Sequence, residues 1–356
     1  DVSYVAGNHT ISVGIDNVVS RVKDFGDMSP GPGYSWDYGH TDHPDQPISK
    51  DAGRNFVPAP ADFPNGQNGY YVYRHVVGNR VNVRSTQRAQ YIEDKWQLTD
   101  QWLLSIGLRN DQFTDYNQFG KPFIKQTKPQ WAPRLGASWD VNGDGSFKVF
   151  ANAGRYYLGL PLNPATGAAA GYTDTQQYYT YSGIDAATGA PTGLTQISGP
   201  VSGNNSYGIP PDPRTVAGKN LKAEHQDEFI LGFDKSFGDH WVYGAKATQR
   251  ILRSVIDDFC DVGLVTDKAT ALGHTIGSSN SCYLINGGAA NTFTLIDNNG
   301  QAFSVPLSRE EMGFPAVKRK YYSLEGFLEH TFDGVWYGKI DYVFSRSYGD
   351  SEGQAR

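Results

Sequence analysis

Apolar and polar residues alternate along several long segments of this chain. In each such run an apolar side chain stands at every second position, mostly with small or polar residues between. Alternation of this kind points successive side chains to opposite faces of a strand. Each run spans about ten residues, enough for a tilted strand to cross a bilayer. We therefore expect lipid to contact the most regular apolar positions, which are Trp102, Leu104, Ile106, Leu108, Phe229, Leu231 and Phe233.

The connections between these runs alternate between short and long. The short ones carry hairpin-turn residues at 6–9, 99–101, 142–145, 238–240 and 333–335. The long ones, rich in Gly, Pro, Asn, Ser and Tyr, cover 21–80, 114–129, 159–220 and 258–319. Tight turns at one end and long loops at the other are typical of an antiparallel up-and-down membrane barrel.

This pattern predicts one partial strand and nine full strands. The partial strand covers 1–5, and the full strands cover 10–20, 81–98, 101–113, 130–141, 146–158, 221–237, 241–257, 320–332 and 336–349. The apolar segment 70–77 also resembles a strand, but the strict alternation of connections places it as a local hairpin inside a long loop.

Aromatic residues flank four of the short turns. The pairs are Trp96 and Trp102, Trp139 and Phe147, Phe237 and Trp241, and Phe332 and Trp336. Aromatic girdles of this kind mark the membrane interface in outer-membrane barrels. Cross-strand packing in a soluble sheet is the alternative, and repetition at successive turns favours the girdle.

Composition agrees with an all-β membrane barrel. Hydrophobic residues make up 38% and charged residues 19% of the 356 residues, and the mean hydropathy is −0.50. No apolar run approaches the roughly 18 residues of a spanning helix. In a membrane barrel only every second residue of a strand must be apolar, so the mean hydropathy of the chain stays low. The net charge of −6 argues against a nucleic-acid partner. The sequence begins directly with a predicted strand at Asp1, and the first and last strands would each have an unpaired edge. Because unpaired strand edges promote aggregation, we interpret the chain as a barrel fragment.

The polar face of the predicted strands carries charges of both signs, as expected for a wall that faces water or a plug. The solvated face of a soluble sheet is the alternative. The charged positions assigned to the lumen are Arg109, Asp111, Lys148, Arg155, Glu224, Glu228, Lys246, Arg250, Glu325, Glu329, Lys339 and Asp341.

No constellation of catalytic residues stands out, so an enzyme is not expected, nor is a cofactor. The segment 140–145 matches half of a calcium loop, but Ala151 stands where the bidentate Glu belongs, which favours a polar hairpin turn. A cluster of His40, Asp42, His43 and Asp45 offers metal ligands, although isolated surface clusters of this kind are common. We assign no metal site.

The long loops hold two further features. Cys260 and Cys282 lie in one loop, and a disulfide between them is expected if that loop is extracellular. It would stabilise the loop by about 3 kcal/mol in the chain-entropy model. Loop aromatics either bind ligand or pack the loops together; the candidates for ligand contact are Tyr172, Tyr178, Tyr179, Tyr181 and Trp36.

Several motifs, in order, resemble the barrel of TonB-dependent outer-membrane receptors. The segments 91–96 and 105–109 resemble one barrel strand pair, and 132–136 with 154–157 resembles another. The run 220–232, which includes Asn-Leu-Lys-Ala-Glu-His-Gln-Asp-Glu-Phe, resembles the Oar-like branch, as does Ser-Val-Ile-Asp-Asp-Phe at 254–259. The similarity covers most strands and fails in the long loops.

The resemblance implies a bacterial outer-membrane protein with a barrel of about 22 strands around a plug, of which residues 1–356 form one part. It also implies transport energised by the TonB–ExbB–ExbD complex of the inner membrane. The plug, the TonB-contact segment and the N-terminal domain typical of Oar-like members are absent from this chain. The expected partners are therefore outer-membrane lipid, the remaining barrel strands, the plug and the energising complex.

Three functions compete at this point. The first is active transport of a large or scarce ligand, such as a peptide or protein-derived molecule, and the second is a surface adhesin that binds through its long loops. The third is a soluble glycan-binding protein or glycosidase. Its paired carboxylates would be Glu325 and Glu329, but residues four apart on a strand lie about 13 Å apart, beyond hydrolase spacing. Transport is the preferred interpretation.

Overall fold

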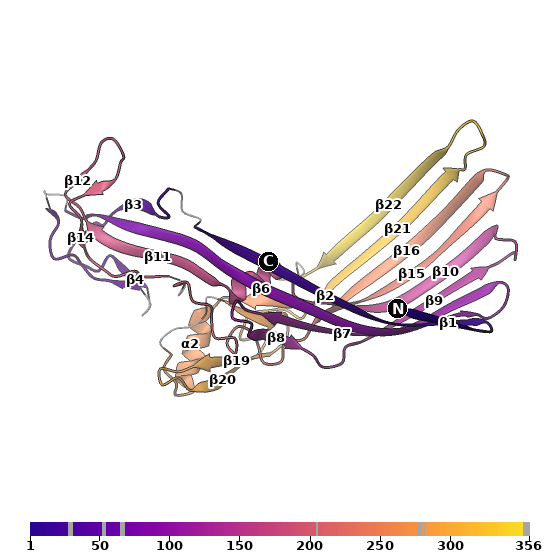
Figure 1. Cartoon of the computed structure of the whole chain (residues 1–356), viewed down its shortest axis with the longest axis horizontal. Helices are drawn as coiled ribbons and strands as arrows, with labels where there is room; N and C mark the ends of the chain where they lie inside the picture. The colour runs from indigo at the N-terminus through magenta and orange to yellow at the C-terminus, as the bar shows by residue number, and fades with distance from the viewer. Residues whose placement is uncertain are drawn as a thin grey trace.

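The chain folds around one long antiparallel sheet (Figure 1). The computed structural model describes residues 1–27, 31–51, 55–64, 68–203, 206–276, 280 and 282–351. Along the main path the strands follow one another in chain order: β1 (Val2–Ala6), β2 (His9–Asp27), β6 (Tyr70–Gln97), β7 (Trp102–Tyr116), β9 (Trp131–Asp140), β10 (Phe147–Leu158), β15 (Glu224–Phe237), β16 (Trp241–Ser254), β21 (Arg319–His330) and β22 (Gly338–Gly349). The predicted partial strand and nine full strands are confirmed within the described ranges.

The sheet is strongly curved but does not close within the described residues. Its path begins at β1 and ends at β22, and no pairing joins these two strands there. All neighbouring pairs along the path are antiparallel and joined by the predicted short and long connections. Glycine permits the tightest of these turns, as at Gly238 between β15 and β16, where φ is 61°. No helix of the described part is long and apolar enough to span a membrane.

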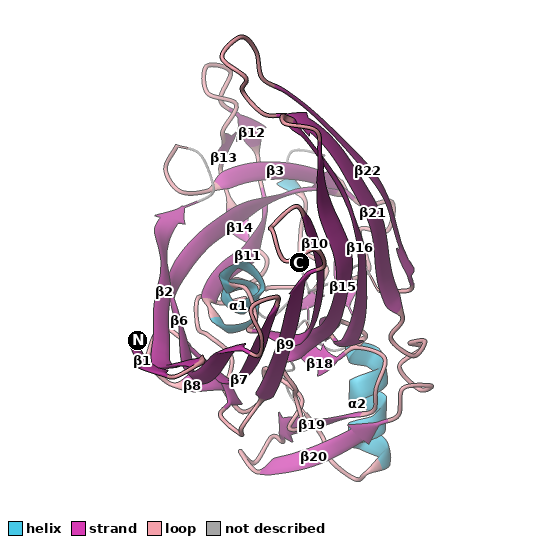
Figure 2. Ribbon diagram, turned by 90° about the vertical axis from the view of Figure 1, so that its right-hand side faces the viewer, coloured by secondary structure: helices cyan, strands magenta, loops and turns pink. Residues whose placement is uncertain are grey.

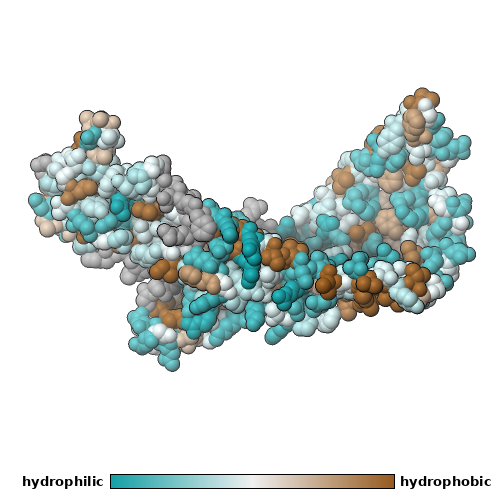
Figure 3. Space-filling view, viewed as in Figure 1, coloured by the Kyte–Doolittle hydropathy of each residue, from teal (hydrophilic) through white to brown (hydrophobic). Residues whose placement is uncertain are grey.

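The strand register places the apolar positions of neighbouring strands side by side. Residues directly opposite one another in an antiparallel pair point to the same side of a sheet. One row across seven strands contains Leu104, Ala137, Ala151, Leu231, Ala247, Leu324 and Phe344. We call the side of the sheet that bears this row the apolar face, and the opposite side the charged face. Hydrophobic side chains gather over the end of the sheet that holds β1, β2 and β7 (Figure 3).

One prediction about the long loops is wrong. Residues 70–77 do not form a local hairpin but are the outer part of β6, which continues without a break from Tyr70 to Gln97. At about 3.3 Å per residue this strand is about 90 Å long, far more than a bilayer requires. β3 (Ser35–His40) pairs with one edge of its outer part and β11 (Gly171–Thr180) with the other.

This outer sheet, which we call the projection, stands at the left of Figure 1. Four short strands accompany it: β4 (Ser49–Asp51) with β5 (Asn55–Val57), and β12 (Gly183–Ile184) with β13 (Pro191–Thr192). β14 (Thr195–Gln196) adds a further short strand beside β11. Long connections therefore extend the barrel wall outward as paired strands.

A small hydrophobic core lies on the charged side of the sheet near its outer end. α1 (Leu162–Ala169) buries Ala165 and Ala169 there against Val81 and Val83 of β6. Phe123 and Ile124 of β8 (Pro122–Gln126) join the same core. Figure 2 shows α1 within the curve of the sheet, so part of a long connection folds back toward the space that the wall encloses.

The connection between β16 and β21 forms a second compact unit, which we call the disulfide subdomain. Its elements are β17 (Ile256–Phe259), α2 (Val262–Ala271), β18 (Tyr283–Asn286), β19 (Asn291–Ile296) and β20 (Ala302–Leu307). They enclose a core that includes Val265, Phe293 and Val305, each fully buried. Asp261 caps α2 by accepting a hydrogen bond from the backbone N–H of Leu264, and Lys268 pairs with Glu311 across the subdomain.

Candidate functional site

The charged face carries a set of cross-strand ion pairs. Lys148 pairs with Asp234 at 2.8 Å and Lys246 pairs with Glu325 at 2.9 Å, in both cases with the directly opposite residue. Further pairs join Glu228 to Arg250 and Lys339 to Glu329 and Asp341. The side chains are partly exposed, so these pairs contribute little to stability and leave the face hydrated.

Arg109 lies at the centre of a separate group on the same face. Its guanidinium donates to Asp16 at 2.8 Å and to Asp111 at 2.9 Å, and Gln87 also donates to Asp111. A cavity of about 450 Å³ lies beside Arg109 and is lined in part by Arg134. Eleven of the twelve charged positions that the sequence assigns to the lumen thus share one face. They are Arg109, Asp111, Lys148, Glu224, Glu228, Lys246, Arg250, Glu325, Glu329, Lys339 and Asp341.

Arg155 does not lie on the charged face, so its predicted place in the lumen is wrong. It lies on β10 in the same alternating series as Ala151 and Ala153, and therefore on the apolar face. Its guanidinium makes two hydrogen bonds to Asp227 of β15, at 2.8 and 3.2 Å. A carboxylate that neutralises the arginine locally explains how a charge occupies this face. Charge alone suggested the lumen, whereas the alternation of residues along β10 decides the side.

Aromatic side chains gather at the short-turn end of the sheet, both within single hairpins and between neighbouring ones. Trp102 stacks on Trp139 of the next strand, with ring centroids 5.2 Å apart. Trp336 stacks on His330 at 3.8 Å, and Phe237 stacks on Trp241 at 6.0 Å. The row continues to the first strands, where His9 stacks on Trp96. The rings therefore form a belt along one end of the wall, as a membrane-interface girdle requires.

The projection brings together all five aromatic residues suggested for ligand contact. Trp36 lies on β3, Tyr172, Tyr178 and Tyr179 lie on β11, and Tyr181 follows β11 directly. Their environments differ, because Tyr178 is 8% exposed and Tyr181 is 6% exposed, whereas the other three are only partly buried.

The two buried tyrosines pack the projection together. Tyr178 contacts Tyr71 and Tyr73 of β6, with centroids 5.8 and 5.1 Å away. Burial raises the pKa of Tyr178 to about 12, with smaller contributions from Tyr71 and Tyr73. Tyr181 packs edge-on against Tyr38, whose hydroxyl donates to the carbonyl oxygen of Gly189.

Trp36 and Tyr179 offer more accessible aromatic surface. Their rings meet edge to face at 5.7 Å, across the projection from β3 to β11. Tyr34 packs against the other side of Trp36 at 5.6 Å, and the guanidinium of Arg74 lies 5.2 Å from the Tyr34 ring. Three separate segments of the chain thus build one aromatic surface.

A polar group on the opposite side of the projection was not anticipated. Nε2 of His75 lies 2.8 Å from a carboxylate oxygen of Asp174, and its Nδ1 lies 3.6 Å from Asp37. Burial raises the pKa of Tyr73 beside this group, and the charge of Asp37 adds to the shift. These residues come from β3, β6 and β11, so no local spacing in the sequence indicates them.

In the described residues, side chains of both metal-like segments make contacts within the protein. Asp140 accepts hydrogen bonds from the backbone N–H groups of Gly143 and Gly145, at 3.1 and 2.8 Å. Its side chain thus shapes the hairpin turn, as predicted for this segment. His40 lies 3.5 Å from Asp42 and packs on the ring of Tyr70.

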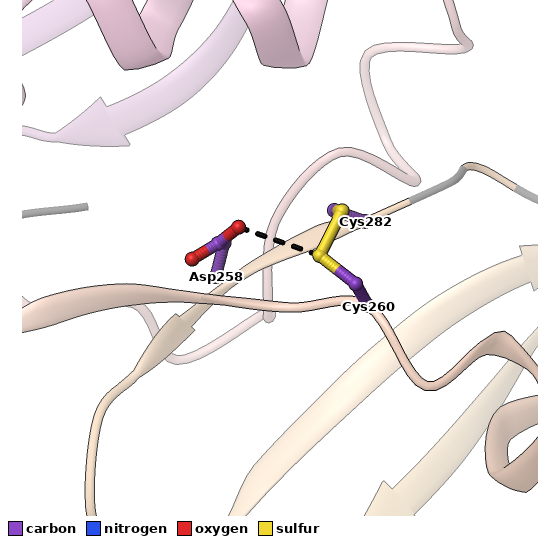
Figure 4. Close-up of side chains that lie close together, drawn as sticks. All are labelled: Asp258, Cys260 and Cys282. Carbon is purple, nitrogen blue, oxygen red and sulfur yellow. Dashed lines mark hydrogen bonds between the residues drawn. A yellow bond between two sulfur atoms is a disulfide. The ribbon is translucent and has the colours of Figure 1, made fainter. Parts of the chain in front are cut away.

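Cys260 and Cys282 form the predicted disulfide, with an S–S distance of 2.04 Å (Figure 4). An oxygen of Asp258 lies 3.3 Å from the sulfur of Cys260. A disulfide sulfur carries no proton to donate and is not a thiolate, so this trio is not a metal centre. The bond joins the end of β17 to the start of β18 and closes the segment that contains α2.

The apolar face, the aromatic belt and the charged opposite face together define the wall of an outer-membrane β-barrel. The chain belongs to the TonB dependent receptor-like β-barrel family, whose model matches residues 3–248. Members of this family are transporters and receptors of the bacterial outer membrane. This assignment confirms the predicted fold, family and location.

A curated relative supports the same assignment. The chain is 25% identical over 296 residues to the TonB-dependent transporter Oar of Myxococcus xanthus. The alignment covers 76% of this chain and 24% of that protein, so the chain spans about a quarter of its relative's length.

Two solved receptors align with almost the whole chain. The siderophore receptor PirA of Pseudomonas aeruginosa is 13% identical with a TM-score of 0.33, over 98% of this chain and 61% of that one. The alcaligin receptor FauA of Bordetella pertussis is 9% identical with a TM-score of 0.29, over 96% of this chain and 54% of that one. Likeness at this level carries no argument about ligand or mechanism.

Proposed function

We propose that this chain forms the wall and outer mouth of a TonB-dependent transporter that takes up a large or scarce ligand. The observation that carries the proposal is the apolar face, continuous across the strands of a chain that belongs to this family. Residues 1–356 would be one part of a barrel of about 22 strands, completed at the edges of β1 and β22.

The charged face would then line the lumen. A row of paired charges such as Lys246–Glu325 remains hydrated and presents polar groups of both signs to a plug. Such a plug, together with a segment that contacts the TonB–ExbB–ExbD complex, would couple the inner-membrane energy source to transport. Uptake in this scheme requires energy, while the first binding of ligand at the mouth does not.

The projection is the proposed place of first contact with ligand. It extends β6 well beyond the bilayer and carries the partly exposed rings of Trp36, Tyr172 and Tyr179. Aromatic rings offer large contact areas at low entropic cost, and tyrosine adds a hydroxyl group. Tyr178 and Tyr181 would hold this surface in shape, because both are buried. A peptide or protein-derived ligand is large enough to span the rings of β3 and β11.

The test uses the full-length receptor at its natural level in the native host. Cells receive an isotopically labelled protein digest, and mass spectrometry measures which peptides leave the medium and which stay bound at the surface. Deletion of the receptor gene should abolish both signals. Loss of TonB, or a protonophore, should abolish uptake and leave surface binding intact.

Matched variants locate the contact. Replacing Trp36 and Tyr179 together by alanine should weaken surface binding by about tenfold or more. The control is Phe332→Ala at the short-turn end, an aromatic that is 66% exposed, which should leave binding unchanged. Binding without uptake in energised cells would identify an adhesin instead and overturn the transport proposal.

A further inference from the structure

Cationic side chains gather on the apolar face at the outer end of the sheet, where hydrocarbon contact ends. One row of directly opposed residues crosses five strands there and contains Arg155, Asp227, Ile251, Lys320 and Tyr348. The neighbouring row toward the turn end contains Ala153, Phe229, Gln249, Tyr322 and Arg346. The side of the wall that meets lipid thus changes from apolar to basic within one or two rows.

Two arginines at this level share a single carboxylate. Arg155 binds both oxygens of Asp227, and Nε of Arg253 donates to the same carboxylate at 2.9 Å. A register shift opposite His225 and Gln226 leaves Arg253 as an extra residue in β16, and its ion pair draws its side chain toward Asp227. The side chains of Arg155 and Arg253 remain 36% and 47% exposed, while that of Asp227 is 13% exposed.

Lys320 and Arg346 extend the basic group to the last two strands. The guanidinium of Arg346 lies 5.7 Å from the ring of Tyr348, which stacks on Tyr322. Gln249 donates to the hydroxyl group of Tyr322 at 3.0 Å. The two rows and the bulged Arg253 together thus hold four cations, several tyrosines and one carboxylate, that of Asp227, so the patch has an excess of positive charge.

The patch lies at the level of the opposite membrane interface from the aromatic belt. On β16, Trp241 belongs to the belt and Arg253 to the patch. The 12 residue steps between them span about 40 Å of strand, or about 30 Å along the barrel axis at the usual tilt. This distance is close to the thickness of the hydrocarbon core.

We propose that Arg155, Arg253, Lys320 and Arg346 bind the phosphate groups of a multiply phosphorylated lipid in the outer leaflet. The acyl chains of such a lipid would lie on the apolar row beneath, against Leu231, Leu324 and Phe344. Arginine suits this task, because its planar donor fork binds phosphate oxygens in pairs. Asp227 positions two of the four cations and prevents their mutual repulsion. The inference rests on the proposed orientation of the barrel, with the apolar face toward lipid.

The experiment uses the full-length receptor in nanodiscs of phosphatidylcholine that contain a small fraction of bisphosphorylated lipid A. Native mass spectrometry counts the bound lipid A, and titration gives its affinity. The triple variant R253Q/K320Q/R346Q removes three cations but spares Arg155 and its bond to Asp227. Because each cation should contribute about fivefold to the affinity, removal of three should lower the affinity for lipid A on the order of 100-fold.

A matched variant, K148Q/K246Q/R250Q, removes the same charge from the opposite face and should bind lipid A like the wild type. The charge-conserving variant R253K/K320R/R346K should lose much less affinity than R253Q/K320Q/R346Q. Resistance of the folded barrel to SDS at room temperature shows that each variant has folded.

Equal binding by the wild type and R253Q/K320Q/R346Q would overturn the proposal, as would equal affinity for lipid A without phosphates. Displacement of lipid A by millimolar inorganic phosphate would show a free-phosphate site and overturn the lipid assignment. Ligand uptake is measured separately on cells: if uptake fails while lipid A binding follows the prediction, the transport function is wrong and the lipid site stands.

Discussion

Replacing Leu231 by arginine tests directly which side of the sheet meets lipid. Leu231 lies near the middle of β15, between Ala151 and Ala247 of the neighbouring strands, and its side chain is 60% exposed. In water an exposed site of this kind accepts arginine at little cost. If lipid covers it, the arginine at the bilayer midplane costs about 2–4 kcal/mol, a change in the unfolding equilibrium of about 30- to 1,000-fold.

The adjacent residue supplies the control. Ile230 points to the opposite side of the same strand, with Asn152 and Thr248 as its cross-strand neighbours. Arginine there enters the hydrated lumen, so Ile230→Arg should cost less than about 1 kcal/mol. Both free energies come from denaturant titration of the full-length receptor in lipid vesicles, followed by tryptophan fluorescence. Equal costs for Leu231→Arg and Ile230→Arg, or a larger cost at Ile230, would refute the assignment of the two faces.

Three further predictions concern the outer parts of the molecule. Replacing both cysteines by serine should destabilise the disulfide subdomain by about 3 kcal/mol and speed its cleavage by added protease on intact cells; an unchanged rate would contradict a stabilising role. Tetranitromethane at pH 8 should nitrate Tyr70, which is 48% exposed, well before Tyr178, because Tyr178 is buried and its pKa is raised to about 12. Comparable nitration of the two by peptide mapping would show that Tyr178 is open to ligand. In the folded subdomain, hydrogen bonds from Lys268 and the backbone of Ser308 lower the pKa of Glu311 from 4.5 to about 2. Its stabilising contribution is therefore present above pH 4.5 and is lost as the pH falls toward 2. Protease protection measured from pH 6 to pH 3 should show this loss, and Glu311→Gln should remove that part of the pH dependence.

The alternation of apolar and polar residues was enough to predict the membrane-spanning part of the fold. Runs such as 102–108 and 229–233 are strands with the expected sidedness, because a side-chain period of two fixes which residues share a face. The positions of the short turns could also be predicted, because Asp140 and the glycines that follow it are residues typical of tight turns. The disulfide also followed from local evidence, because both cysteines lie within one loop.

The outer part of the molecule was predicted less well. The run 70–77 is β-like in sequence, but its partners in β3 and β11 lie about 35 and 100 residues away along the chain, so the alternation of connections wrongly predicts a local hairpin. The group of His75, Asp37 and Asp174 depends on the same long-range pairing. No periodic signal within a single segment could have indicated which strands meet.

Sequence by itself determined that the chain is a barrel wall of the outer-membrane type, because hydrocarbon and water impose opposite demands on alternate residues of every spanning strand. Tertiary structure decided how the apolar face accommodates a charge. The alternation of residues places Arg155 in series with Ala151 and Ala153 on that face, and its register partner Asp227 neutralises it there. Tertiary structure also decided that Tyr178 is buried among the strands of the projection, while Trp36 remains partly exposed. Both outcomes depend on which strands pair and in what register, and that is set by contacts between segments distant in the chain.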